Sequence, residues 1–381
     1  YECVPMRFIK HVYKIHTYAQ DGRLFEGKTP VSAFLNSSYD GSFIAGLMEL
    51  RYIQSLPVER IINYFESHGF TLKKPTAHKL MEKASSLFEN LYKCIRQTAL
   101  SDPYKAADET YYKILVPEKN SKGKGFRKGY LWVVVGINTR MIYLLYDDGS
   151  RSEKVILNEL GGCKGIIQSD GYSPYRKLES DAYPHITRIP CLQHIKRKFI
   201  DCGEDDPDAK RIVEMINTLY QNEHKHKIGV DGWTVEQNLV HRKKYAPDIL
   251  GEIKDVLDDI EERGDLLPKS ELKEAITYLR NEWNAVVDIF NYGDTYLDNN
   301  IVERMNRYIS LSRKNSLFFG SHKGAERGAI LYTIALTCRM NKVNLFEYLT
   351  DVINRTAEWQ PNTPLEKYRQ LLPDRWEKAN D

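Results

Sequence analysis

The sequence predicts a mixed α/β protein in which a sheet follows a helical region and is interrupted by a helical insertion. β-Branched and aromatic runs begin near residue 104 and recur as YYKILV, YLWVVVGI and MIYLLY, a composition typical of strands. Helix and strand patterns then alternate up to residue 204, which favours a sheet with antiparallel and parallel strands. Residues 205–295 show only helical patterns. Domain boundaries are therefore expected where the sequence pattern changes between that of helices and that of strands.

Residues 41–100 are expected to form a helical region ahead of the sheet. The stretch SFIAGLMELRYIQ predicts one helix, Pro57 opens a second, and a turn at Gly69 leads into a long third helix over 75–100. Two helices joined by a short Gly-containing turn, the second carrying Lys and His, fit a DNA-binding helix-turn-helix. Any small helical subdomain has the same pattern, so both interpretations stay open.

Residues 101–204 are expected to form the first part of the sheet, with a carboxylate at the end of two strands. Asp108 lies at the start of the first strand, and Asp170 follows the apolar run GIIQS, where Gly171 lets the backbone turn. The carboxyl ends of strands are where α/β folds build sites. Simpler interpretations exist: Asp170 as a helix N-cap, and Asp108 as a strand-edge charge. Glu109 stands next to Asp108, so it stays ambiguous which of the two carboxylates is the candidate site residue.

The rest of the chain is expected to be largely helical. Residues 205–295 form the insertion, and charge runs in it such as KDVLDDIEER are interpreted as solvated helix faces. Residues 296–330 complete the core with its last helix. Residues 331–381 form a helical tail that ends in a Pro-rich segment.

The composition describes an ordinary globular protein without a global positive field. The chain has 381 residues and a net charge of +3, so any nucleic-acid surface must be local. Its 6 cysteines are scattered without a C-x-x-C pair, which favours reduced thiols in a cytosolic setting. The longest apolar runs are too short to cross a bilayer, so no membrane partner is expected.

The stretch Leu297–Ser321 predicts a helix with one polar stripe. At about 100° per residue, one narrow face carries amides, cations, a serine and a single carboxylate: Asn299, Asn300, Glu303, Arg307, Ser310 and Lys314. The opposite face carries Ile301, Met305, Tyr308 and Ile309, and Asp298 is the expected N-cap. A solvated face with a Glu303–Arg307 pair is the simplest interpretation. The cations and aromatics of the following RKNSLFFGSHKG favour an anionic substrate instead.

Asp108, Asp170 and Glu303 together form an all-oxygen set of candidate ligands. Such a set selects hard cations, Mg²⁺ or Mn²⁺, over zinc. Two such ions about 3.5–4 Å apart stabilise the attacking and leaving oxygens in phosphoryl transfer. The sequence therefore predicts two bound Mg²⁺ (or Mn²⁺) ions.

Four segments resemble the DDE transposases of the insertion-sequence-sixty-six family: YLWVVVG, QSDGYSPY, CLQHIKRKF and LDNNIVERMNRY…RKNSLFFGSHKGAERGA. The resemblance runs from about residue 40 to the C-terminus. It implies a ribonuclease-H-like catalytic core with a helical insertion before its last acidic residue. It further implies that Asp108 (in DET), Asp170 (in SDGY) and Glu303 (in NNIVER) form the metal-binding catalytic triad. The ions of such enzymes activate water, and then a 3′-hydroxyl, to attack DNA phosphodiesters.

Two further groups of residues follow from the same segments. Cys191 and His194 match a C-x-x-H pattern that follows the second Asp in this and related transposases. Zinc would need further ligands, and none stands at a useful spacing, so we expect this pair to shape the site. Candidate phosphate contacts are the cations nearby: Lys196, Arg197, Lys198, Arg304, Arg307, Arg313, Lys314 and Lys323.

The chain departs from the family near its start. The family normally carries a cysteine-rich zinc-binding segment around residues 15–30, where this chain has HTYAQDGRLFEG without cysteine. Residues 1–40 are therefore expected to be a degenerate remnant of that segment. The amino-terminal helical region usual in the family is also expected to be missing.

These features predict a transposase that cleaves and joins double-stranded DNA, acting on element terminal repeats and target DNA. A homo-oligomer, possible accessory proteins and a cytoplasmic, nucleoid-associated location are expected with it. The alternative is a catalytically decayed remnant that only binds DNA. A metal-dependent nuclease without strand transfer is a third interpretation.

Overall fold

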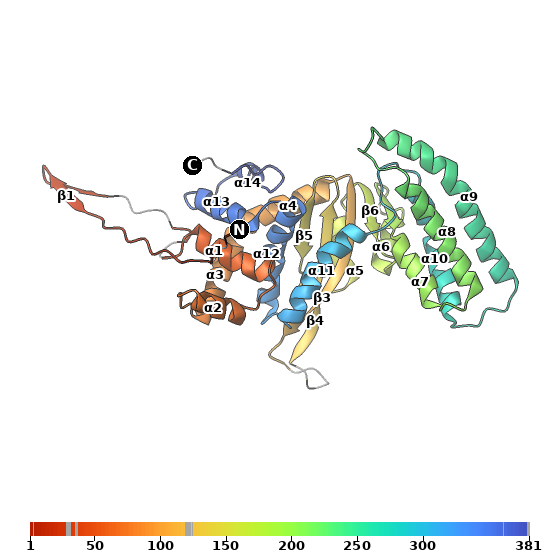
Figure 1. The fold of residues 1–381 in the computed structure, drawn as a ribbon, viewed down its shortest axis with the longest axis horizontal. Coiled ribbons are helices and arrows are strands. Elements are labelled where there is room, and N and C mark those ends of the chain that lie inside the picture. The colour runs from red at the N-terminus through yellow and green to blue at the C-terminus, as the bar shows by residue number, and fades with distance from the viewer. Residues whose placement is uncertain are drawn as a thin grey trace.

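The computed structural model describes residues 1–2, 4–27, 32–34, 37–118, 123, 125–360 and 362–378. Part of the predicted zinc-segment remnant, residues 28–31 and 35–36, lies outside the described residues. The molecule is elongated, with the sheet in the middle, a helical unit at one end and a two-stranded hairpin at the other (Figure 1).

Five strands form the mixed sheet that the sequence predicts. They are β3 (Tyr104–Leu115), β4 (Phe126–Gly136), β5 (Met141–Leu145), β6 (Gly165–Ser169) and β7 (Ile186–Pro190). Their order is β5-β4-β3-β6-β7; β3, β4 and β5 pair antiparallel, whereas β6 and β7 run parallel to β3. The long strand β3 is therefore central, and it pairs with both halves of the sheet.

Strand β3 begins earlier than predicted, so Asp108 lies inside it and not at its start. The prediction placed Asp108 at the start of the strand, and alanine and acidic residues are depleted in strands. Ala106 and Ala107 are fully buried between β4 and β6, where their small side chains fit a crowded sheet centre. Burial between two neighbouring strands outweighs the local propensity here.

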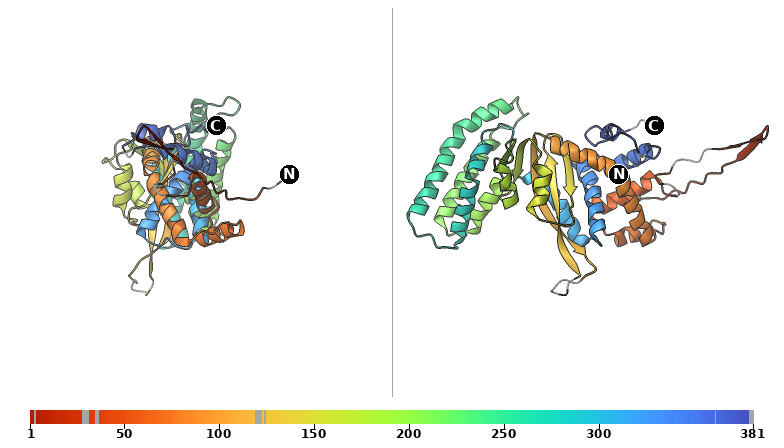
Figure 2. Two further views of the ribbon diagram at one scale, coloured as in Figure 1. Left: turned by 90° about the vertical axis from the view of Figure 1, so that its left-hand side faces the viewer. Right: turned by 180° about the vertical axis from the view of Figure 1, so that it is seen from behind.

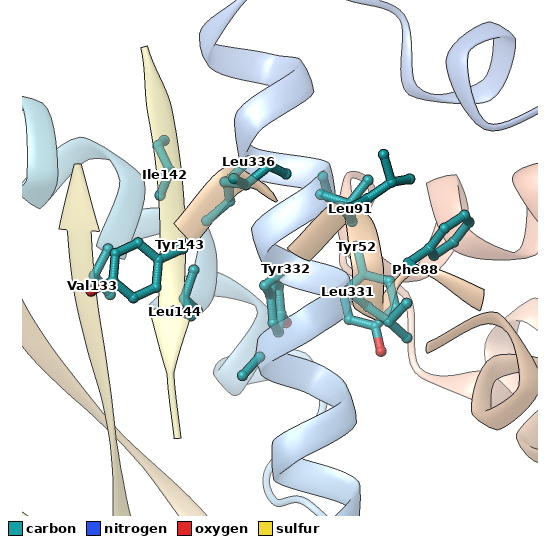
Figure 3. Packing of buried hydrophobic residues seen from close by; sticks show 14 of the residues in the cluster. Tyr52, Phe88, Leu91, Val133, Ile142, Tyr143, Leu144, Leu331, Tyr332 and Leu336 are labelled. Atoms are coloured by element: carbon teal, nitrogen blue, oxygen red, sulfur yellow. The ribbon is translucent and has the colours of Figure 1, made fainter. Parts of the chain in front are cut away.

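The free edge of β5 is covered by helix α12 (His322–Met340). Leu144 N–H donates to Thr333 Oγ1 at 2.9 Å, and Thr337 Oγ1 donates to the carbonyl of Ile142 at 2.9 Å. Figure 3 shows this helix with β5 on one side and side chains of the amino-terminal helices, such as Tyr52, on the other. Two threonines therefore satisfy backbone groups that an open sheet edge would expose.

The amino-terminal helices share one hydrophobic core with the sheet and with α12. They are α1 (Gly41–Tyr52), α2 (Val58–Ser67), α3 (Lys74–Leu87) and α4 (Glu89–Ser101), joined by α13 (Leu345–Thr356) and α14 (Leu365–Arg369). The single long helix predicted over 75–100 is wrong, because the chain leaves helical geometry at Phe88. The ring of Phe88 is fully buried, so the break turns an aromatic side chain into the core.

The insertion forms a second core at the far end of the molecule (Figure 2). Its helices α8 (Pro207–His224), α9 (Val235–Glu262) and α10 (Glu271–Ile289) pack on α7 (Leu192–Asp201), which follows β7 directly. This arrangement agrees with the absence of strand patterns in the predicted insertion. Helix α10 also contacts β7, so the insertion packs against the sheet edge nearest the candidate site.

A hairpin of β1 (Thr17–Gln20) and β2 (Arg23–Glu26) extends away from the body, and all of its residues are exposed (Figures 1 and 2). It occupies part of the segment where the predicted zinc-binding remnant was placed. Across the part of the chain that the structure describes, no helix combines the length and the apolar character of a membrane span.

Candidate active site

Asp108 lies in β3, and Asp170 directly follows β6, the parallel neighbour of β3, at the same level of the sheet. Strands β3 and β6 pair with Ala106 opposite Gln168, so two residues further along Asp108 stands opposite Asp170. Asp170 follows the last residue of β6 directly, as predicted. Opposite residues of a parallel pair point to the same face of the sheet. The topology thus brings together two of the three predicted carboxylates.

The carboxyl group of Asp108 is held in an unfavourable environment. Desolvation, followed by the charges of Glu109 and Asp170, raises its pKa to about 8. Two hydrogen bonds to the carboxylate oppose this effect: Glu109 N–H donates at 2.8 Å and Asn306 Nδ2 donates at 2.6 Å. A cation beside Asp108 and Asp170 would relieve the repulsion between them.

Asp170 is positioned by helix α10 of the insertion. Gly171 N–H donates to the hydroxyl of Tyr278 at 2.9 Å, and Tyr172 N–H donates to Asp170 Oδ1 at 3.1 Å. A Cβ atom on Gly171 would lie 2.5 Å from Tyr278 Oη, so only glycine fits between the strand end and α10. The guanidinium of Arg188 in β7 donates to the carbonyl of Asp170 at 3.1 Å.

Glu109, the neighbour of Asp108 in β3, already has a cationic partner. Arg151 pairs with Glu109 at 2.6 Å, and the hydroxyl of Tyr175, in α6 (Ser173–Arg176), donates to it at 3.3 Å. A carboxylate already neutralised by Arg151 is a poor candidate for a metal ligand, so the geometry supports Asp108.

Helix α11 (Asn300–Asn315) lies along β3 on the Asp108 face (Figure 1). Two side chains two turns apart fix it there: Asn299 Nδ2 donates to the carbonyl of Ala107 at 2.9 Å, and Asn306 donates to Asp108. Glu303 lies between them on the same helical face, at i+4 from Asn299 and i−3 from Asn306.

The burial of α11 differs from the predicted stripe. Its most buried side chains are Asn299, Val302, Asn306, Ile309 and Ser312, so the helix buries amides together with apolar groups. Of the other residues of the predicted polar stripe, Asn300, Arg307 and Lys314 are exposed, whereas Glu303 and Ser310 are half-buried. The N-cap position is Asn299 and not Asp298, whose carboxylate accepts the N–H of Asn300 at 3.1 Å.

The side chain of Glu303 faces a cysteine and a histidine. Cys191, His194 and Glu303 each offer a ligand atom, and these atoms lie within 4.8 Å of one another; among the described residues this is the one such group of three. The separation between His194 Nε2 and Glu303 Oε1 is 3.7 Å. The three predicted carboxylates do not form so tight a group. The structure brings Asp108 and Asp170 together, and Glu303 lies one helical turn before Asn306, which binds Asp108.

A cleft of about 340 Å³ opens beside Asp170, and cations line it. Arg151, Arg197 and Lys198 contribute to its wall, together with His194 and Tyr278. Two of the predicted phosphate contacts, Arg197 and Lys198, therefore face the same space as a candidate metal ligand. Such a wall suits a phosphodiester backbone, which carries one negative charge per phosphate.

The other predicted cations are less uniform. Those exposed on α11 and α12 are Arg304, Arg307, Lys314 and Lys323, whereas Lys196 is half-buried. Arg313 donates to the carbonyl of Tyr111, and its guanidinium lies 3.9 Å from the centroid of that ring. Arg313 therefore has an internal partner, and the availability of its charge to DNA stays a prediction.

Several residues that build the site were missed from the sequence. Asn306 holds Asp108, Arg151 neutralises Glu109, and Arg188 and Tyr278 hold the loop at Asp170. Asn306 carries a detectable signal, since it lies one helical turn after Glu303. The others contact partners 18 to 107 residues away, and no local spacing reveals them.

Comparison with known proteins identifies the family to which the chain is similar. A family model described as "Transposase IS66 family" matches residues 36–327. The chain is also similar to three uncharacterized proteins of Sinorhizobium fredii (strain NBRC 101917 / NGR234). Identity is 26% with y4jD over 87% of this chain, 24% with y4hP over 100%, and 26% with y4qI over 96%. The matched regions span 65%, 70% and 69% of those relatives' own lengths.

Substituting Asp108 by Asn is expected to stabilise the metal-free fold at alkaline pH. An aspartate has a pKa of about 3.9 in an unfolded chain, and folding raises that of Asp108 to about 8. Between these values the folded state holds a proton that the unfolded state releases, so wild-type stability falls as pH rises, by up to about 1.4 kcal/mol per pH unit. Asn does not titrate.

The free energy of unfolding, measured in a chelator at pH 5, 7 and 9, tests this. The increase in the free energy of unfolding caused by Asp108→Asn should be largest at pH 9. Glu326→Gln is the control for the loss of one charge on an exposed side chain. Parallel pH profiles for wild type and Asp108→Asn would contradict the assignment.

Substituting Gly171 by Ala is expected to destabilise the fold by about 1–3 kcal/mol, since the new Cβ would overlap Tyr278. Gly162→Ala is the matched control, because nothing lies within 4 Å of its Cβ position. The double variant Gly171→Ala/Tyr278→Ala should lose no more stability than Tyr278→Ala alone. Additive losses in a denaturant titration would rule out the proposed contact.

Proposed function

The chain belongs to the IS66 family of transposases, and from this premise we propose that it cleaves and joins DNA at the ends of an insertion element. The observation that carries the proposal is the register of β3 and β6, which sets Asp108 opposite Asp170 on the face where α11 carries Glu303. A ribonuclease-H-like core with a helical insertion before Glu303 is the fold proposed for this arrangement.

Asp108, Asp170 and Glu303 would hold two Mg²⁺ or Mn²⁺ ions. The donor set fits hard cations, because all three side chains offer oxygen. Two further observations support the fit: the raised pKa of Asp108 next to Asp170, and the Oδ1 atoms of Asn299 and Asn306, which are buried without a hydrogen-bond partner among the described residues. Bound ions supply charge neutralisation at the attacking and leaving oxygens of the phosphodiester.

The protein side chains position the DNA strand around this centre. Arg197 and Lys198 face the cleft at Asp170 and would bind the phosphates on either side of the scissile one. Exposed cations on α11 would hold more distant phosphates. In-line attack depends on this alignment, because a small displacement of the reacting groups costs a large part of the rate.

Recognition of DNA ends is proposed for α2 and α3. These helices pack on each other through a turn at Gly69, and Lys73 and Lys79 are exposed beside them. A helix pair of this kind can place its second helix in the major groove. A second copy of the chain and accessory proteins are proposed partners for bringing two DNA ends together.

A DNA-binding remnant without catalysis is the second candidate function. The observation that favours it is the placement of Glu303, which contacts His194 and Cys191 and not a compact group of three carboxylates. A nuclease that cleaves without joining strands is a third candidate. Assays of cleavage, joining and binding separate the three.

Asp170→Asn and Glu303→Gln are each expected to reduce cleavage of a labelled duplex with element ends to background, because each removes one metal ligand. DNA affinity should stay within about twofold of wild type, since phosphate contacts supply most of it. Cleavage in Mg²⁺ and in Mn²⁺ and electrophoretic binding are the measurements.

Glu326→Gln, on the exposed face of α12, is the matched control and should cleave normally. Wild-type cleavage by Asp170→Asn or Glu303→Gln would remove that residue from the triad. Binding without cleavage by the wild type in both metals would favour the remnant, and cleavage without joined products would favour the nuclease.

Arg304→Ala/Arg307→Ala is expected to weaken DNA binding and flatten its dependence on salt. Each lost phosphate contact should lower the slope of log K against log[salt] by about 0.9. Arg313→Ala is the informative comparison, because its internal contact with Tyr111 predicts lost stability together with any change in slope. An unchanged slope in the double variant would remove these two arginines from the interface.

A further inference from the structure

We infer that Cys191, His194 and Glu303 form a second metal site, suited to a softer divalent ion of the Zn²⁺ class, and that an ion there competes with the hard ions for Glu303. The site itself rests on the geometry of these three residues. The competition rests on the proposed function, in which Glu303 is a ligand of the catalytic ions.

The three ligand atoms are already gathered. Cys191 occupies the N-cap position of α7 and His194 lies in the first turn of that helix, so the C-x-x-H spacing directs both side chains toward α11. Tetrahedral zinc, with bonds of about 2.0–2.3 Å, keeps its ligand atoms about 3.4–3.6 Å apart. The 3.7 Å between His194 Nε2 and Glu303 Oε1 is close to that value. A small closure would complete the site.

The histidine ring supplies an independent observation. Its Nδ1 atom is buried and has no hydrogen-bond partner among the described residues, while its Nε2 atom faces Glu303 beyond hydrogen-bond distance. Buried polar groups are normally satisfied. With Nδ1 unpaired, no hydrogen bond among the described residues fixes the ring, and Nε2 is directed at Glu303 where an ion would lie between them. Neutral histidine offers a lone pair to a metal ion and is the commonest metal ligand in proteins.

The cysteine sulfur is also held in place. The backbone N–H of Asn299 donates to Cys191 Sγ at 3.2 Å, and the Asn299 side chain in turn binds the carbonyl of Ala107. Hydrogen bonds from surrounding groups orient metal ligands in this way. Binding of the ion would release the thiol proton to solvent and form a metal–thiolate bond without change of oxidation state.

The donor types separate the two sites by metal. Sulfur and nitrogen donors select ions of the Zn²⁺ class, whereas Asp108 and Asp170 offer only oxygen and select Mg²⁺ or Mn²⁺. Glu303 is the one ligand that both sets would share. With Glu303 held by a Zn²⁺-class ion, the hard ions keep two carboxylates, and catalysis should fall.

Co²⁺ is the probe for the site, since it replaces Zn²⁺ and reports thiolate ligation by absorption. Full-length protein titrated with Co²⁺ should develop a sulfur-to-metal charge-transfer band. Cys191→Ser should lose the band and His194→Ala should bind at least about tenfold more weakly. Cys202→Ser is the matched control, since this thiol lies at the opposite end of α7, and it should retain the band.

The same proteins test the competition. Cleavage in excess Mg²⁺ should be inhibited by Zn²⁺ in wild type and in Cys202→Ser, and the inhibiting concentration should rise at least about tenfold in Cys191→Ser relative to its own zinc-free rate. No charge-transfer band in wild type, or an equal band in Cys191→Ser, would overturn the site. Equal inhibition of Cys191→Ser would overturn the competition. A protein that shows the band but cleaves in no metal would refute the proposed function and leave the site standing.

Discussion

A buried arginine joins the helical insertion to the sheet, and the position of Asp170 depends on it. Arg188 in β7 is 1% exposed and is paired with Glu282 of α10, also 1% exposed, and with Glu179. The same guanidinium donates to the carbonyl of Asp170. Removing one partner of a buried ion pair costs about 3–5 kcal/mol, because the other charge is left unpaired. The insertion is therefore part of the structure that holds the candidate site.

The candidate site carries an electrostatic cost in the metal-free protein. Asp108 is desolvated at the centre of the sheet and faces the charge of Asp170, which disfavours its ionised form. Asn306 and the backbone of Glu109 offset part of this cost by donating hydrogen bonds. The charge of the neighbouring Glu109 is neutralised by Arg151. Such an arrangement sacrifices stability for a charge-binding centre, as functional sites commonly do.

The sequence predicted the mixed sheet and its many helices because strand and helix patterns are local. β-Branched runs marked β4 to β7, and the helical period marked 205–295. The start of β3 and the break at Phe88 were missed, since both depend on burial against distant elements. For the site, spacing and the family resemblance indicated the carboxylates. The residue types alone did not show whether Asp108 or Glu109 is the better candidate ligand. The structure favours Asp108, because Glu109 is paired with Arg151.

The positions of Asn299 and Asn306 bear on the proposed role of Glu303 as the third carboxylate. These amides anchor α11 on β3 on both sides of Glu303, so the backbone of Glu303 cannot slide along the strand. For the Glu303 carboxylate to move from His194 toward Asp108, its side chain must therefore rotate while the backbone stays in place. Glutamate has one more rotatable bond than aspartate and a longer reach. If Glu303 serves both proposed sites, a fixed helix with a long acidic side chain would permit two alternative ligand sets without a change of fold, and the metal that is present would determine which set forms.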